Sequence, residues 1–377
     1  MTNPWRARFP IFAHSIYLNS CSYGALSDAV EAAYHAYLAS RHARGADWEG
    51  WCGKNEIVRG QIARLLGATD GEIAVTTSAS AALNSLVSAL QPTPERNRVV
   101  LSGFEFPTVG QIWHAQAGRG FEVATAQEHA GAVPLEAFER LIDERTLIVS
   151  IAHVCYRNGA MNDVAEIVRL ARARGAMVLL DAYQAVGAVP VDVAALDVDF
   201  AIGGVLKYLL SSAGVGFLYL RQSRLDDLDP YATGWFAQTD IGAMDMHHHR
   251  PAADARRFES GTPPIPNLFA AEAGLGLVHD IGVERIRAHV LPLTARLKDG
   301  VAALGGTLAT PADPARHGAM IAVRARDDHA LVAKLAERRI ITSCRDGNLR
   351  VSPHFYNTEQ DIDALLEALA ANRALLA

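Results

Sequence analysis

Two apolar runs, each followed by a single charged residue, constrain the fold of this chain more than any other feature. Residues 178–180 (VLL) end at Asp181, and residues 200–202 (FAI) are followed by two glycines and then by Lys207. Such runs predict buried strands, and α/β proteins bind ligands at the edge where parallel strands end. We therefore predict that one acid and one amine lie at the same edge of a sheet.

An acid and a lysine at one sheet edge suit pyridoxal 5'-phosphate (PLP) as a cofactor. The amine of Lys207 would form the Schiff base, and Asp181 would face the pyridinium nitrogen and keep it protonated, so that the ring accepts electrons from a substrate Cα. Strand-end aspartates are often structural and most lysines lie at the surface. A buried ammonium is costly unless it is paired or used, however, and this favours the functional interpretation.

A small hydroxylic join precedes this region and is typical of an anion site. Residues 73–77 are rich in β-branched residues and predict a strand, whereas Leu83, Leu86, Val87 and Leu90 have helical spacing. The join contains Ser78, Ala79 and Ser80, and a helix N-terminus offers unpaired N–H groups to a phosphate. The alternative, that a serine here is only a helix N-cap, stays open.

Composition limits the class of protein. The chain has 377 residues, 50% of them hydrophobic, which predicts one large and one smaller domain. A net charge of −6 argues against nucleic-acid and anionic-membrane binding, and no apolar stretch is long enough to span a bilayer. The N-terminus lacks a signal-peptide pattern and the four cysteines are scattered, so we expect free thiols and a cytoplasmic location.

These motifs, together with FPT at residues 106–108, RFESGTPPI at 257–265 and LRVSPHFYN at 349–357, resemble the aminotransferase class V family of fold-type I PLP-dependent enzymes. Cysteine desulfurases, kynureninases and isopenicillin N epimerase-like proteins belong to it. The resemblance implies an α/β fold in which helices flank a mixed, mostly parallel sheet. It also implies a large PLP-binding domain over residues 16–262 and a smaller C-terminal α+β domain over residues 263–377, with residues 1–15 packed near the latter.

The resemblance assigns roles to particular residues. Ser78, Ala79 and Ser80 would hold the phosphate, Phe106 would stack on the ring, and Gln184 would bond its 3'-oxygen or imine region. Gly261 and Thr262 would reach the phosphate of a partner subunit, which implies a homodimer with shared active sites. Arg350 would clamp the substrate carboxylate with its guanidinium fork. The other candidates for cofactor or substrate contact are Tyr156, Asn19, Tyr23 and Trp235, and each could instead be a packing, turn or loop residue.

The chain also departs from its relatives. Many of them have a serine three residues before the lysine and a histidine just before it, where this chain has Gly204 and Leu206. Val109 replaces the acid of kynureninases. Cys344 lies close before Arg350 in a strand-and-turn pattern, not in the mobile loop that desulfurases need. Three adjacent histidines, residues 247–249, do not share one face, so we expect a solvated loop and no metal site.

The reaction is the least determined feature. Lys207 would remove the Cα proton of an L-amino acid through its aldimine with PLP, and we expect a lyase that performs β-elimination, with C–S lyase-like chemistry on a cysteine conjugate. A class V aminotransferase is the next choice, followed by a kynureninase-like hydrolase, an epimerase or a cysteine desulfurase. Two other classes remain, a nucleotide-binding α/β protein and a silent PLP-binding regulator. The absence of GxGxxG and P-loop motifs opposes the first, and the absence of a basic patch opposes the second.

Overall fold

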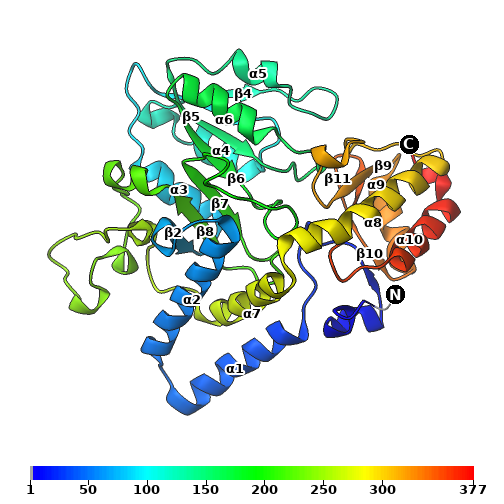
Figure 1. Cartoon of the computed structure of the whole chain (residues 1–377), viewed down its shortest axis with the longest axis horizontal. Helices are drawn as coiled ribbons and strands as arrows, with labels where there is room; N and C mark the ends of the chain where they lie inside the picture. The colour runs from blue at the N-terminus through cyan, green and yellow to red at the C-terminus, as the bar shows by residue number, and fades with distance from the viewer. Residues whose placement is uncertain (1–2) are drawn as a thin grey trace.

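The computed structural model describes residues 3–377 and contains a large and a small sheet (Figure 1). The large sheet has seven strands in the order β2-β8-β7-β6-β5-β3-β4. Only β8 runs antiparallel to its neighbours, so the predicted mixed, mostly parallel sheet is confirmed. Its strands are β2 (Ile73–Thr76), β3 (Arg98–Ser102), β4 (Glu122–Ala126), β5 (Thr146–Ala152), β6 (Met177–Asp181), β7 (Phe200–Gly204) and β8 (Gly216–Leu220).

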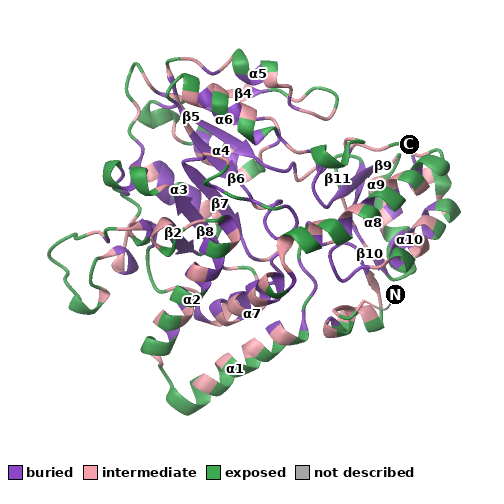
Figure 2. Ribbon diagram, in the orientation of Figure 1, coloured by how far each residue is buried: buried purple, intermediate pink, exposed green. Residues whose placement is uncertain are grey.

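Helices cover both faces of this sheet, because alternate side chains of each strand point to opposite faces. On β6, Val178 and Leu180 join one core cluster and Leu179 joins the other. The first cluster includes side chains of α2 (Trp48–Leu66), α5 (Leu135–Glu139), α6 (Val164–Ala173) and α7 (Ile265–Ile281), and the second those of α3 (Ala79–Ala89) and α4 (Pro107–His114). Figure 2 shows the result, with buried strands between helices whose outer faces are exposed.

The small sheet, β11-β12-β9, packs with the C-terminal helices around a third core cluster. Its elements are β9 (Ile321–Arg324), β11 (Ser343–Arg345), β12 (Asn348–Val351), α8 (Val283–Ala303), α9 (Asp328–Glu337) and α10 (Glu359–Ala371). Leu18 belongs to this cluster, beside the short pairing of β1 (Ile16–Tyr17) with β10 (Ile340–Ile341). Side chains of α7 belong to the large core. The predicted division into domains at residues 15 and 262 stays a prediction.

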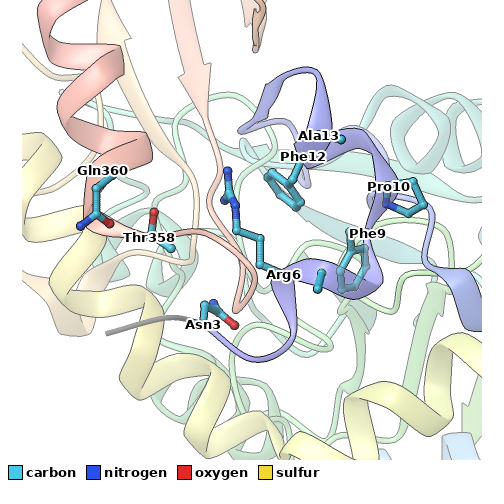
Figure 3. Close-up of a pocket in the computed structure, with 9 residues that line it drawn as sticks. Asn3, Arg6, Phe9, Pro10, Phe12, Ala13, Thr358 and Gln360 are labelled. Carbon is cyan, nitrogen blue, oxygen red and sulfur yellow. The ribbon is translucent and has the colours of Figure 1, made fainter.

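The N-terminal segment lies against the start of α10. The guanidinium of Arg6 donates to both carboxylate oxygens of Asp361, at 2.6 and 3.0 Å, and packs over the ring of Phe12. Figure 3 shows the open hollow of about 780 Å³ beside these residues, with Thr358 and Gln360 on its far side. The lining of this hollow combines apolar rings with the guanidinium of Arg6, which Asp361 already binds. The hollow is therefore a gap between packed segments of the fold. Within residues 3–377, no helix has both the length and the apolar character that crossing a membrane requires.

Candidate active site

The carboxyl ends of the parallel strands form the floor of a cavity of about 310 Å³. Asp181 is the last residue of β6, and Lys207 follows the end of β7 by three residues. The topology therefore brings the predicted acid and amine to one edge. The cavity is lined by Ser22, Ser78, Ala79, Ser80, Phe104, Phe106, Thr108, Val109, Ala152, Val154, Tyr156, Asp181, Tyr183, Gln184, Ile202, Leu206 and Lys207.

Asp181 and Lys207 influence each other inside this enclosed site. Burial raises the pKa of the Asp181 carboxyl, and the N–H of Tyr183, which donates to its Oδ1 at 2.9 Å, and the charge of Lys207 lower it. Burial lowers the pKa of Lys207 to about 8, against the opposing effect of Asp181. The lysine amine therefore carries a free electron pair in a useful fraction of molecules at neutral pH, which a nucleophile or base requires.

Two aromatic rings flank the amine of Lys207. Its Nζ lies 4.5 Å from the ring centroid of Tyr183 and 5.8 Å from that of Phe106. Phe106 meets Tyr156 edge to face, with centroids 5.0 Å apart, and is itself 45% exposed at the mouth of the cavity. Phe106 occupies the N-cap position of α4 because Pro107 follows it and holds its backbone extended. The predicted stacking residue thus lies in the cavity with an open face.

The N-terminus of α3 forms one wall. Ser78 is the N-cap residue, and its Oγ accepts from the N–H of Ala81 at 3.1 Å. The capping interpretation is therefore correct, and it is compatible with an anion site, because the N–H groups of Ala79 and Ser80 have no acceptor within residues 3–377. A Cβ on Gly216 would lie 2.5 Å from the carbonyl carbon of Ser78, so only glycine lets β8 approach this turn.

Arg350 on β12 reaches the large domain from the small sheet. Its Nη1 donates to the carbonyl of Tyr156 and its Nη2 to the Oγ of Ser343, each at 3.0 Å, while its buried Nε has no partner among residues 3–377. The charge of Arg350 lowers the pKa of Lys207, so the two cations share one region. A buried guanidinium with an unused donor suits a carboxylate ligand. Its role stays a prediction.

The N-terminal segment YLNSCSYG contributes differently from the prediction. Ser22 lines the cavity, and the carbonyl of Cys21 accepts from Gln184 Nε2 at 3.0 Å. Asn19 pairs with Ser352 outside the cavity lining, and its Oδ1 is buried without a partner. The Tyr23 hydroxyl donates to Ser212 Oγ and accepts from the N–H of Ala213. The segment is therefore held in place at the cavity, with a serine that we did not predict.

Trp235, Gly261 and Thr262 do not line this cavity. The indole of Trp235 donates to the carbonyl of Ile241 at 2.6 Å and packs edge to face against Trp48. In the RFESGTPPI segment, buried Glu259 pairs with Arg59 at 2.6 Å and accepts from the N–H of Val75, which fastens the segment to α2 and β2. Gly261 and Thr262 then project as exposed residues. Their proposed contact with a partner's cofactor is untested.

Glu105 is a half-buried residue with a buried carboxyl group that we did not predict. One oxygen accepts from the N–H of Ala152, and the other is buried without a partner. Burial and the neighbouring charge of Asp181 raise the pKa of Glu105 well above its usual range, whereas the charge of Lys207 acts to lower the pKa of Asp181. In the sequence, the signal that could have identified Glu105 was its position just before Phe106, the predicted ring-stacking residue. An acid before an exposed aromatic residue is also typical of a surface loop, so this signal is weak.

Cys344 and the histidine loop lie away from the cavity. The Cys344 thiol contacts His329 Nδ1 at 3.6 Å, on the side of β11 opposite to Ser343, and Asp328 is nearby. The side chains of His248 and His249 approach different aspartates, Asp245 at 2.9 Å and Asp229 at 3.7 Å, in an exposed loop. Neither arrangement points toward Lys207.

The donor set of the cavity fits PLP. An amine with a lowered pKa faces a buried carboxylate, a helix N-terminus with free N–H groups forms one wall, and an aromatic ring lies at the mouth. These correspond to the aldehyde, the pyridine nitrogen, the phosphate and the ring face of the cofactor. Residues more than 100 positions apart in the sequence, such as Ser78 and Lys207, thus line one cavity.

Comparisons with known proteins agree with this interpretation. The sequence profile of the family described as "Aminotransferase class-V" matches residues 24–365. An "Uncharacterized aminotransferase" of Bacillus subtilis is 34% identical, over 97% of both chains. A kynureninase of Pseudomonas fluorescens is 30% identical over 91% of this chain and 85% of its own, and an isopenicillin N epimerase of Streptomyces clavuligerus is 32% identical over 83% of each.

Solved structures confirm the fold. A cysteine desulfurase from Thermococcus onnurineus superposes with a TM-score of 0.89 at 23% identity, over 99% of both chains. The cystine C–S lyase C-DES superposes with a TM-score of 0.87 at 22% identity, over 96% of this chain and 99% of its own. The fold-type I architecture, the PLP cofactor and an enzymatic function, all predicted from the sequence, are thereby confirmed. The chain belongs to the aminotransferase class V family of PLP-dependent enzymes.

Proposed function

We propose that this enzyme is a lyase that cleaves a cysteine conjugate by β-elimination. This proposal rests on the small number of acid and base groups that line the cavity. Lys207 is the amine of lowered pKa, and Phe106, Val109, Val154 and Leu206 form an apolar part of the lining. Within residues 3–377, no cysteine lines the cavity. One base and an apolar wall are sufficient for β-elimination of a thiolate.

Three residues have separate roles in the proposed reaction. Arg350 would bind the substrate carboxylate and orient Cα toward Lys207, whose free amine would hold the cofactor and serve as the base for the Cα proton. Asp181 holds the proton on the pyridine nitrogen. When bound, PLP supplies the electron sink that stabilises negative charge at Cα. The Cβ–S bond breaks with its electron pair on sulfur, and no general acid is required because thiolates leave easily. With water, the products are a thiol, pyruvate and ammonia.

The other chemistries find less support in the cavity. A desulfurase needs a thiol that reaches the substrate sulfur, and Cys344 faces α9. Kynureninases have an acid at the position of Val109. In this chain the position places an apolar side chain in the cavity lining. Transamination is the second candidate, and it is favoured by the 34% identical Bacillus subtilis relative, which is described as an aminotransferase. It would use the same Lys207 and Asp181.

Product analysis separates the two candidates. We expect an S-alkyl-L-cysteine to release equal amounts of thiol, pyruvate and ammonia without a 2-oxo acid acceptor, and Lys207→Ala to release none. Matched reactions with L-alanine plus 2-oxoglutarate measure transamination. Keto acid that appears only when an acceptor is present, with no free thiol from the conjugate, would refute the lyase proposal in favour of the aminotransferase.

Two further properties belong to the proposal. A homodimer is supported by the exposed apolar side chains of Leu26, Leu38, Trp48 and Ile57, which lie on or beside α1 (Asp28–Arg44) and α2. A cytoplasmic location is supported by four free cysteines, of which Cys21 and Cys155 are buried.

A further inference from the structure

Tyr183 occupies the space that a side chain at residue 204 would need. A Cβ built on Gly204 would lie 2.4 Å from the Tyr183 hydroxyl oxygen and 2.5 Å from the ring carbon that bears it. Any residue larger than glycine at this strand end would therefore collide with the tyrosine. The two residues form one unit, in which the hydroxyl of Tyr183 takes the place of a short side chain on β7.

This position lies beside the anion-binding end of α3. Gly204 pairs directly with Gly216 on β8, and opposite residues of an antiparallel pair present their Cβ positions to the same face, about 5 Å apart. A Cβ on Gly216 would meet Ser78 and the amide nitrogen of Ala79, at 2.5 and 2.8 Å. The Tyr183 hydroxyl and the N-terminus of α3 thus lie over one face of two neighbouring strands.

The hydroxyl is also available. Tyr183 lines the cavity with Ser78, Ala79 and Ser80, and its hydroxyl makes no hydrogen bond to residues 3–377. Burial and the charge of Asp181 raise its pKa, so the group stays a protonated donor. A donor that faces a cavity without a protein partner is suited to a ligand oxygen.

We propose that the Tyr183 hydroxyl donates a hydrogen bond to the phosphate group of PLP, in the place that a hydroxylic side chain at residue 204 would otherwise fill. Gly204 then serves to accommodate Tyr183. This inference rests on the cofactor alone and holds whichever reaction the enzyme performs.

Equilibrium titration of the apoprotein isolates the phosphate contact. PLP and pyridoxal, which lacks the phosphate, are titrated against the wild type and Tyr183→Phe, and binding is followed by the visible absorbance of the lysine-linked cofactor. Because hydrogen bonds to charged groups are strong, we expect Tyr183→Phe to raise the Kd for PLP about tenfold or more and to leave that for pyridoxal within about twofold. Tyr219→Phe is the control, since Tyr219 is buried in β8 outside the cavity.

An unchanged Kd for PLP, or an equal loss for PLP and pyridoxal, would overturn the inference, because the tyrosine would then act through packing or through Lys207. Thermal unfolding of each apoprotein checks that the variants fold. The titrations require no turnover, so they stay valid if the proposed lyase activity is absent.

A double-mutant cycle tests the pairing of Tyr183 with Gly204 independently. Gly204→Ser alone should weaken PLP binding because its Cβ collides with the tyrosine, and Tyr183→Ala alone should weaken it because the donor is lost. In the combined variant the serine hydroxyl has room, and we expect it to bind PLP at least about fivefold more tightly than the product of the two single effects predicts. Simple additivity would contradict the proposed exchange of one hydroxyl for another.

Discussion

At the scale of single residues, the catalytic proposal depends on how burial changes two ionisable groups. Lys207 and Asp181 lie at the end of a buried sheet, where desolvation disfavours both charges and each charge partly stabilises the other. Glu105 adds a second carboxyl group nearby, and burial together with the charge of Asp181 raises the pKa of Glu105 well above its usual range. The two carboxyl groups differ in their surroundings, because the charge of Lys207 acts to lower the pKa of Asp181.

The lowered pKa of Lys207 predicts a pH dependence for cofactor attachment. Only the free amine attacks the aldehyde, so the rate constant of PLP attachment to the apoprotein should rise about tenfold per pH unit below pH 8 and level off above it. For an ordinary lysine, the rate constant would continue to rise up to about pH 10.4. Stopped-flow absorbance measures the rate, and N-acetyl-lysine in parallel corrects for titration of PLP itself. A corrected rate that still rises tenfold per unit between pH 9 and 10 would contradict the proposed environment of Lys207.

Asp181→Asn should slow proton loss from the substrate Cα by at least about 100-fold, because an amide does not keep the pyridine nitrogen protonated. Deuterium exchange at Cα, followed by proton NMR of an L-amino acid in D₂O, measures this step without depending on the later fate of the substrate. Asp192→Asn, at an exposed position, is the matched control. If Asp181→Asn exchanged the Cα proton at the wild-type rate, the proposed role of the Asp181 carboxylate would be wrong.

At the scale of secondary-structure elements, alternation along β11 separates two neighbouring side chains. Ser343 lies on the side of Arg350 and accepts from its guanidinium, whereas Cys344 faces His329 of α9. The strand-and-turn pattern around Cys344 was visible in the sequence, but the sequence does not reveal which residue of the pair points inward. Pairing with β12, in which Ser343 lies opposite Arg350, determines it.

This alternation predicts opposite outcomes for two adjacent substitutions. Ser343→Ala removes a hydrogen bond that holds the guanidinium of Arg350, and we expect KM for the amino acid to rise about tenfold while kcat changes little. Cys344→Ser should leave both constants within about twofold of the wild type. Steady-state kinetics on one substrate measures both. A large loss of kcat in Cys344→Ser would revive persulfide chemistry, and an unaltered KM in Ser343→Ala would mean that Arg350 is held by other contacts.

The elements also explain how much of the site could be predicted from the sequence. Asp181, Lys207 and the join at Ser78 were recognisable because each follows an apolar run, and strand ends of a parallel sheet meet at one edge. Ser22, which lines the cavity, and Glu105, whose carboxyl group is buried close to Asp181, were not, because they come from loops whose path depends on the assembled core. The role of Tyr183 depends on a contact with Gly204 across two strands, which no local pattern records.

At the scale of the whole molecule, the chain leaves part of its active-site region uncovered. Phe106 is 45% exposed at the mouth of the cavity, and Tyr23, which follows the cavity-lining Ser22 in the sequence, is 40% exposed. The helix α1 packs on α7 but presents mostly exposed or half-buried residues, as Figure 2 shows. Gly261 and Thr262 are fastened by Glu259 yet project outward. A second copy of the chain would cover these surfaces and bring its own Thr262 to the cofactor.

Complementation between two inactive variants tests this shared site. Lys207→Ala disables the site of its own subunit, and Thr262→Asp should disable the partner's site because a carboxylate repels the cofactor phosphate. In a heterodimer of the two, one site carries both changes and the other carries neither. Equal mixing, after dissociation and reassociation, should therefore restore about a quarter of the wild-type specific activity, since half of the dimers contain one intact site of two. Light scattering establishes the dimer. Lys298→Ala mixed with Thr262→Asp is the control, which should keep about half of the wild-type activity, because Lys298→Ala homodimers contain two intact sites and each heterodimer contains one. If Lys207→Ala with Thr262→Asp stays inactive while each variant dimerises, both residues serve the same subunit, and the proposal of shared active sites is wrong.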